Sequence, residues 1–118
     1  MDIFVPHPHT KLPGSTFPDA SITPVNSHGE ITHDDIANSR AFIHVFPFAG
    51  IQLGDVITCA QTVKDGTWIS PREVTDPGAT INVIVRSLNG DSETTIWYHV
   101  RRNGELLGRS GDRVYKAV

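Results

Sequence analysis

The sequence predicts a small all-β protein built as a sandwich of antiparallel strands. From residue 21 onward, short runs of β-branched and aromatic residues alternate with polar ones, which is the period of a half-buried strand. Gly, Asn, Asp and Pro separate these runs at short, regular intervals, as hairpin turns do. No stretch carries the 3.6-residue apolar period of a helix of any length. About seven strands at this spacing favour a β-sandwich, with a single closed barrel as the alternative architecture.

The first twenty residues differ from the rest and predict an extended N-terminal arm. Four prolines fall within them: Pro6, Pro8, Pro13 and Pro18. Proline fixes φ and removes a backbone donor, so this stretch suits neither a central strand nor an ordinary helix. The short run Ile-Phe-Val at 3–5 can still pair at a sheet edge. We therefore divide the chain into a Pro-rich arm at 1–20 and a sandwich domain at 21–118.

The strands of the domain follow from the alternating runs between turn signals. In chain order the expected strands are 21–25, 41–46, 56–63, 67–69, 74–75, 80–85 and 93–102, with a return that starts at 106–107 and closes at 113–118. The turns that separate the later strands are expected at Asp65-Gly66, Asp76-Pro77-Gly78, Asn89-Gly90-Asp91 and Asn103-Gly104. Residues 31–39 are expected to connect two strands, with one helical turn capped by Thr32.

The inward positions of these strands define the expected core. Six residues belong to it: Ile43, Val45, Ile81, Val83, Tyr98 and Val100. Cys59 is the sole cysteine, so a disulfide within the chain is impossible. It lies in an apolar run without a cationic neighbour, which predicts a buried and unreactive thiol.

Length and charge limit the classes of function. A chain of 118 residues predicts one domain. Its net charge of −3 argues against a nucleic-acid binder, which needs a basic patch to neutralise phosphates. No apolar stretch is long enough to insert into a membrane, and the N-terminus lacks the features of a cleavable signal. We therefore expect a protein of the cytoplasm, one exported by a signal-independent route, or a fragment of a larger chain.

The sequence gives no positive support for catalysis or for a metal or other cofactor. It contains no Gly-x-Ser-x-Gly, no phosphate-binding loop and no His-Glu-x-x-His. The histidines His7, His9, His28 and His33 follow no ligand spacing, and a structural zinc site needs four ligands that usually include cysteine. We expect a protein that is not an enzyme.

Two segments carry a resemblance to a known family. They are A-F-I-H-V-F-P-F-A-G-I-Q-L-G-D-V-I-T at 41–58 and I-W-Y-H-V-R-R-N-G at 96–104, followed by Ser110 and a final strand at 114–118. In this combination, residues 29–118 resemble the tandem immunoglobulin-like repeats of large bacterial surface adhesins found in pseudomonads. The resemblance implies an immunoglobulin-like sandwich with a structural, adhesin-like role.

Two outward-facing rows are the candidate binding residues. On the longest expected strand, alternation places Trp97, His99 and Arg101 on the face away from the core, where an exposed Trp is unusual. Phe42, His44 and Phe46 form a second outward row on the strand at 41–46, of which Phe42 and His44 are the candidate binding residues. In an immunoglobulin topology these two strands belong to different sheets, so one continuous site from both rows is not expected.

Two functions fit these features. The first is a structural or protein-interaction module that associates with itself or with a protein partner through the arm and the edge strands. The alternative is a carbohydrate-binding module in which Trp97 and its neighbours stack on a sugar ring. The proline-rich arm is expected to lie over an apolar patch, with Trp97 the leading candidate, either on its own domain or on a neighbouring subunit.

Overall fold

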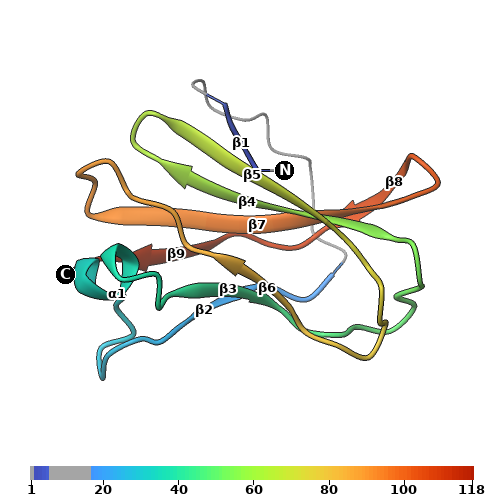
Figure 1. Cartoon of the computed structure of the whole chain (residues 1–118), viewed down its shortest axis with the longest axis horizontal. Helices are drawn as coiled ribbons and strands as arrows, with labels where there is room; N and C mark the ends of the chain where they lie inside the picture. Colours follow the sequence, from blue (N-terminus) through green and yellow to red (C-terminus); the bar gives the residue numbers. More distant parts are fainter. Residues whose placement is uncertain (1, 6–16) are drawn as a thin grey trace.

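Two β-sheets lie face to face in the computed structural model of the chain, which describes residues 2–5 and 17–118 (Figure 1). Within these residues, the larger sheet has the order β1-β5-β4-β7-β8, with β9 also paired to β7, and the smaller has the order β2-β3-β6. All pairings between the named strands are antiparallel. The two separate sheets confirm the predicted all-β sandwich and differ from the single closed barrel.

Most strand bounds follow the predicted turns, but the hairpin from β4 to β5 turns at Lys64-Asp65 rather than at Asp65-Gly66. The larger sheet contains β1 (Ile3–Val5), β4 (Val56–Val63), β5 (Gly66–Glu73), β7 (Glu93–Arg102), β8 (Glu105–Arg109) and β9 (Arg113–Lys116). The smaller sheet contains β2 (Ser21–Thr23), β3 (Phe42–Val45) and β6 (Ile81–Ile84). Strands β4 and β7 match their predicted bounds at both ends. The prediction of a separate strand at 74–75 is wrong, because β5 extends to Glu73. Val74 forms only main-chain hydrogen bonds with Gly54 and Asp55.

The hairpin from β7 to β8 turns through the predicted pair Asn103-Gly104. Both residues have positive φ, 52° and 79°, as a type I′ turn requires. The helical turn predicted after Thr32 is also confirmed. Helix α1 (His33–Ala37) begins where the Thr32 hydroxyl accepts a hydrogen bond from the Asp35 N–H, at 3.1 Å. Among the described residues, no helix has the length and apolarity needed to cross a membrane.

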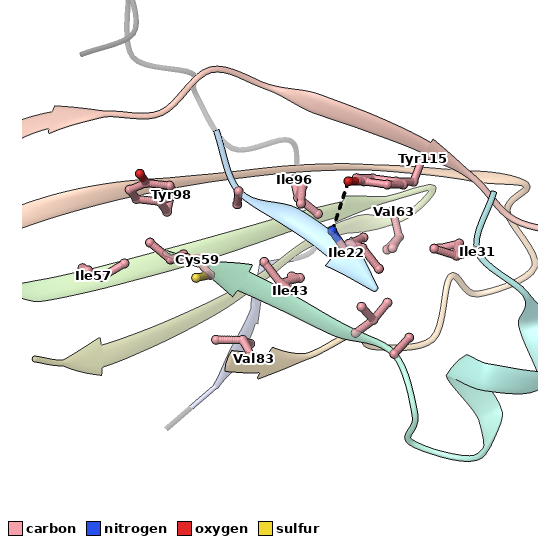
Figure 2. Packing of buried hydrophobic residues seen from close by; sticks show 14 of the residues in the cluster. Ile22, Ile31, Ile43, Ile57, Cys59, Val63, Val83, Ile96, Tyr98 and Tyr115 are labelled. Carbon is pink, nitrogen blue, oxygen red and sulfur yellow. Dashed lines mark hydrogen bonds between the residues drawn. The ribbon is translucent and has the colours of Figure 1, made fainter. Parts of the chain in front are cut away.

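The core lies between the two sheets, where the inward residues of both pack together (Figure 2). Five of the six predicted core residues are buried, and the sixth, Ile81 at the start of β6, is half-buried against the cluster. Cys59 is buried on β4 as predicted, and burial raises the pKa of its thiol to about 12. The thiol therefore stays protonated at neutral pH, which removes the thiolate that reacts with electrophiles.

Side-chain hydrogen bonds attach the residues before β3 to the sandwich. The Tyr115 hydroxyl accepts a hydrogen bond from the Ile22 N–H at 3.0 Å (Figure 2). The Tyr98 hydroxyl donates to the carbonyl of Pro18. Phe17 forms a parallel bridge with Ser110, next to the end of β8. Residues 17–23 are thus integrated into the sandwich.

A buried glutamine links the two sheets. Gln61 on β4 donates from Nε2 to the Arg86 carbonyl at 2.9 Å, and its Oε1 accepts from the Arg86 N–H at 2.8 Å. A side chain of the larger sheet thus satisfies the hydrogen-bonding groups of the Arg86 main chain, which follows β6 of the smaller sheet. Gln61 thereby fixes where the end of β6 sits against β4.

The Gly54-Asp55 corner before β4 contains an ion pair between a buried carboxylate and a half-buried arginine. Gly54 has a φ of 89°, and the buried Asp55 carboxylate accepts from the Gln52 N–H at 2.9 Å. Arg102 at the end of β7 donates to both carboxylate oxygens, from Nε at 2.8 Å and from Nη2 at 2.9 Å. The Arg102 guanidinium lowers the pKa of Asp55, and the Gln52 N–H contributes in the same direction.

We expect Asp55→Asn to lower the free energy of unfolding at pH 7 by about 1–3 kcal/mol. An uncharged amide has one acceptor oxygen, so it cannot accept both hydrogen bonds from the Arg102 guanidinium. The folded-state pKa of Asp55 lies below its unfolded value near 4. The stabilisation is therefore complete above about pH 5 and is lost as the pH falls through the lower, folded-state pKa. Urea unfolding at pH 7 and in acid tests this, with the gap between parent and variant narrowing in acid.

Asp65→Asn is the matched control, since Asp65 is an exposed residue of the β4–β5 turn and the substitution changes the net charge equally. It should leave the urea midpoint nearly unchanged. An Asp55→Asn loss that is the same at pH 7 and in acid would show that the carboxylate charge is not what stabilises the corner.

Candidate functional site

The outward row of β7 is not an open surface at Trp97. The side chain faces away from the core as predicted, but it is only 3% exposed, so the expectation of an exposed Trp is wrong. The guanidinium carbon of Arg109 lies 5.5 Å from the centroid of the indole ring, in cation–π geometry. Arg109 is itself buried and pairs with Asp112. A sugar ring therefore has no free Trp97 face to stack on.

The other two residues of this row differ in exposure. His99 is half-buried, whereas Arg101 is exposed and donates to the Gly104 carbonyl at 3.3 Å. From the row predicted on β7, only Arg101 is exposed at the surface.

Phe42 and His44 lie on β3, in the smaller sheet, so the two predicted rows occupy opposite outer faces of the sandwich as expected. The His44 ring bridges its neighbouring strands. Nδ1 lies 2.6 Å from Asn82 Oδ1, and Nε2 lies 2.5 Å from Thr23 Oγ1. Phe46, with 55% of its surface exposed, stacks on His44 with 6.0 Å between ring centroids.

The Thr23 hydroxyl, the His44 imidazole and the Asn82 amide form a hydrogen-bonded row. A nucleophile, a base and an orienting group are arranged in the same order in catalytic triads. Acyl transfer also needs donors for an oxyanion and a place for the substrate. No pocket opens over the part of the chain that the structure describes. We interpret Thr23, His44 and Asn82 as a cross-strand polar row that stabilises the smaller sheet.

The histidines considered as metal ligands are not brought into a cluster. His7 and His9 lie outside the described residues. Within 2–5 and 17–118, no three His, Cys, Asp or Glu side chains are placed to hold a metal ion together.

The end of the larger sheet carries a site that sequence reasoning missed in part. Strand β1 pairs with β5 in the register Ile3↔Ile69, Phe4↔Trp68 and Val5↔Thr67, which confirms that residues 3–5 pair at a sheet edge. Phe4 packs on Trp68 with 4.7 Å between ring centroids and 55° between planes, and both rings pack against the core.

Beside this aromatic pair, two arginine side chains bind the carboxylate of Asp2. The carboxylate accepts from Arg72 Nη1 of β5 and from Arg86 Nη2, each at 2.8 Å. Arg86 lies two residues after the end of β6, so one guanidinium group comes from the larger sheet and the other from the segment that leaves the smaller sheet. The Arg72 hydrogen bond, followed by that of Arg86, lowers the pKa of Asp2 to about 2. The carboxylate is therefore charged at neutral pH and ties β1 to both layers.

The cluster offers more hydrogen-bond donors and positive charge than Asp2 uses. The guanidinium carbon of Arg86 lies 5.0 Å from the centroid of the Trp68 ring. The Trp68 Nε1–H and the Arg86 Nε–H are both buried without a hydrogen-bond partner. Two cationic side chains thus face one carboxylate, with two donors to spare.

The alternation Asp2-x-Phe4 was the available sequence signal for this site, since both side chains must point to the same side of a strand. Their partners could not be found from spacing, because Arg72 and Arg86 are 70 and 84 residues away from Asp2.

Comparison with known proteins found no matching family model, no similar curated protein and no similar solved structure.

Proposed function

We propose that this chain is a non-catalytic structural or protein-interaction module that joins copies of itself by exchanging strand β1. The observation that carries the proposal is the docking of β1. It lies at the end of the strand order of the larger sheet, and three residue pairs, the Phe4–Trp68 contact and the Asp2 ion pairs hold it there. A second copy offers the same contacts, so exchange changes little in contact energy.

The connection to β1 is long enough for either arrangement. Phe17 bridges Ser110 at the opposite side of the same sheet, five strand spacings from β1, which amounts to about 24 Å. The eleven residues 6–16 reach about 40 Å when fully extended. A chain can therefore fill its own edge at β5 or that of a neighbour. Within one chain, the tethered β1 competes for its own edge at an effective concentration on the order of 1 mM. Exchange between copies is therefore favoured only where the protein concentration approaches this value.

The strand order supports an immunoglobulin-like, adhesin-like module. Labelled in chain order as A, B, C, C′, E, F and G, the strands β2 to β8 form one sheet A-B-E and one sheet C′-C-F-G. Modules of this kind link end to end in structural assemblies, and head-to-tail exchange of β1 would produce such a chain. The carbohydrate-binding alternative lacks its stacking surface, because Trp97, on which it depended, is covered.

The proposal is tested by shortening the connection. A chain lacking residues 8–14 retains four residues between Val5 and Phe17, which reach about 14–18 Å and cannot span the sheet. We expect the parent to be monomeric at tens of micromolar and to associate as it approaches millimolar concentration. The shortened chain should form dimers or longer assemblies throughout this range, as measured by size-exclusion chromatography with light scattering.

Two further variants control this experiment. Replacing residues 8–14 by seven Gly and Ser residues keeps the length and should behave like the parent. Adding Asp2→Arg to the shortened chain should return it to monomers, since like charges then meet at Arg72 and Arg86. A shortened chain that stays monomeric at every concentration would refute exchange of β1.

A further inference from the structure

We infer that the edge of β5, together with Trp68, Arg72 and Arg86, is a binding site for an extended segment of a partner protein with an acidic residue two positions before an aromatic one. Strand β1 is the chain's own occupant of this site. The inference rests on the proposed function in one respect, that β1 can leave its place on β5.

Only alternate residues of a bound strand are recognised. Asp2 and Phe4 both face the inner side, where they meet charged and aromatic partners, while Ile3 between them is 54% exposed. Strand addition to a sheet edge works in this way: the main chain supplies affinity, and pockets for alternate side chains supply specificity. The middle residue of the recognised segment is therefore free to vary.

The aromatic position is defined by Trp68. The Phe4 ring meets the indole at a tilted angle, an arrangement that aromatic pairs favour and an aliphatic side chain cannot reproduce. The segment is short because Pro71, which has no N–H to donate, follows closely after Ile69, the last β5 residue paired with β1.

The acidic position is defined by two arginines that solvent can reach. Arg72 and Arg86 keep 34% and 39% of their side-chain surface exposed, so an incoming carboxylate can approach both. The unused donors, Trp68 Nε1–H and Arg86 Nε–H, and the surplus positive charge give the site capacity beyond what Asp2 satisfies. An amide at this position would lose both charge-assisted bonds.

Binding of a separate segment must compete with the tethered β1. A peptide at micromolar concentration cannot displace a strand whose effective concentration is on the order of 1 mM. The site is therefore closed in the parent and is opened by weakening β1 in the full chain.

The test uses the full-length variant Asp2→Ala/Phe4→Ala and a fluorescein-labelled peptide of residues 1–5, with binding followed by fluorescence anisotropy. We expect the variant to bind at least about tenfold more tightly than the parent. Peptides carrying Asp2→Asn or Phe4→Ala should each bind on the order of tenfold more weakly. Adding Arg72→Ala to the variant should weaken binding similarly, whereas Arg101→Ala, on exposed β7 surface, should not.

Circular dichroism establishes that the double variant is folded, and Asp2→Asn alone replaces it if it is not. Absence of binding to a folded variant, or binding indifferent to both peptide substitutions, overturns the inference. The two proposals fail separately. Peptide binding with a monomeric shortened chain overturns only the proposed self-association, whereas an assembling shortened chain without selective peptide binding overturns only this inference.

Discussion

Replacing Trp97 by alanine is expected to destabilise the protein by about 3–5 kcal/mol, although the residue lies outside the core between the sheets. The ring is almost fully covered and Arg109 stacks on it, so truncation removes a large buried surface and a cation–π contact together. Urea unfolding followed by far-ultraviolet circular dichroism measures the loss without relying on Trp fluorescence.

Phe46→Ala is the matched control, since it removes an aromatic ring that is largely exposed on the opposite outer face. Its effect should stay within about 0.5 kcal/mol, as at most surface positions. If Trp97→Ala were equally mild, the ring would not be part of the packing, and its role as a ligand platform would have to be reconsidered.

The features predicted correctly from the sequence are local ones. Period-two alternation and the Asn103-Gly104 turn are read within a few residues, and they placed β7 and most of the core. The helical turn after Thr32 was similarly predictable, because its cap and the N–H that it binds are three residues apart.

The contact of Arg109 with Trp97 was not predictable from alternation because it depends on a bulge. Leu106 pairs with Arg101 and Gly108 pairs with Val100, so Leu107 is an extra residue in β8. In an unbroken register Leu107 would pair with Val100, so Arg109 would lie opposite Tyr98 and point into the core. The bulge instead places Arg109 opposite His99, on the outer face beside Trp97.

The β1 site was missed for a different reason, namely the distance along the chain between its parts. Asp2, Trp68 and Arg86 come together only when both sheets are assembled, and each looks like an ordinary surface residue in its own segment. The same holds for Gln61 and the main chain of Arg86, which are 25 residues apart.

The largest effect in the core is expected at Tyr98, where packing and hydrogen bonding can be separated. Tyr98→Ala should cost about 3–5 kcal/mol, because the buried ring fills the space between the sheets. Burial raises the pKa of Tyr98, so its hydroxyl stays protonated as the donor to Pro18.

Tyr98→Phe should cost only about 0.5–1.5 kcal/mol, since the exposed Pro18 can turn its carbonyl to water. Tyr115→Phe should cost more, about 1–3 kcal/mol, because the N–H of the buried Ile22 loses its acceptor. Urea midpoints should therefore fall in the order Tyr98→Phe, Tyr115→Phe, Tyr98→Ala, with the last the least stable. If Tyr98→Phe were as damaging as Tyr98→Ala, the hydrogen bond to Pro18, rather than the packing of the ring, would be what holds residues 17–23 and the core together.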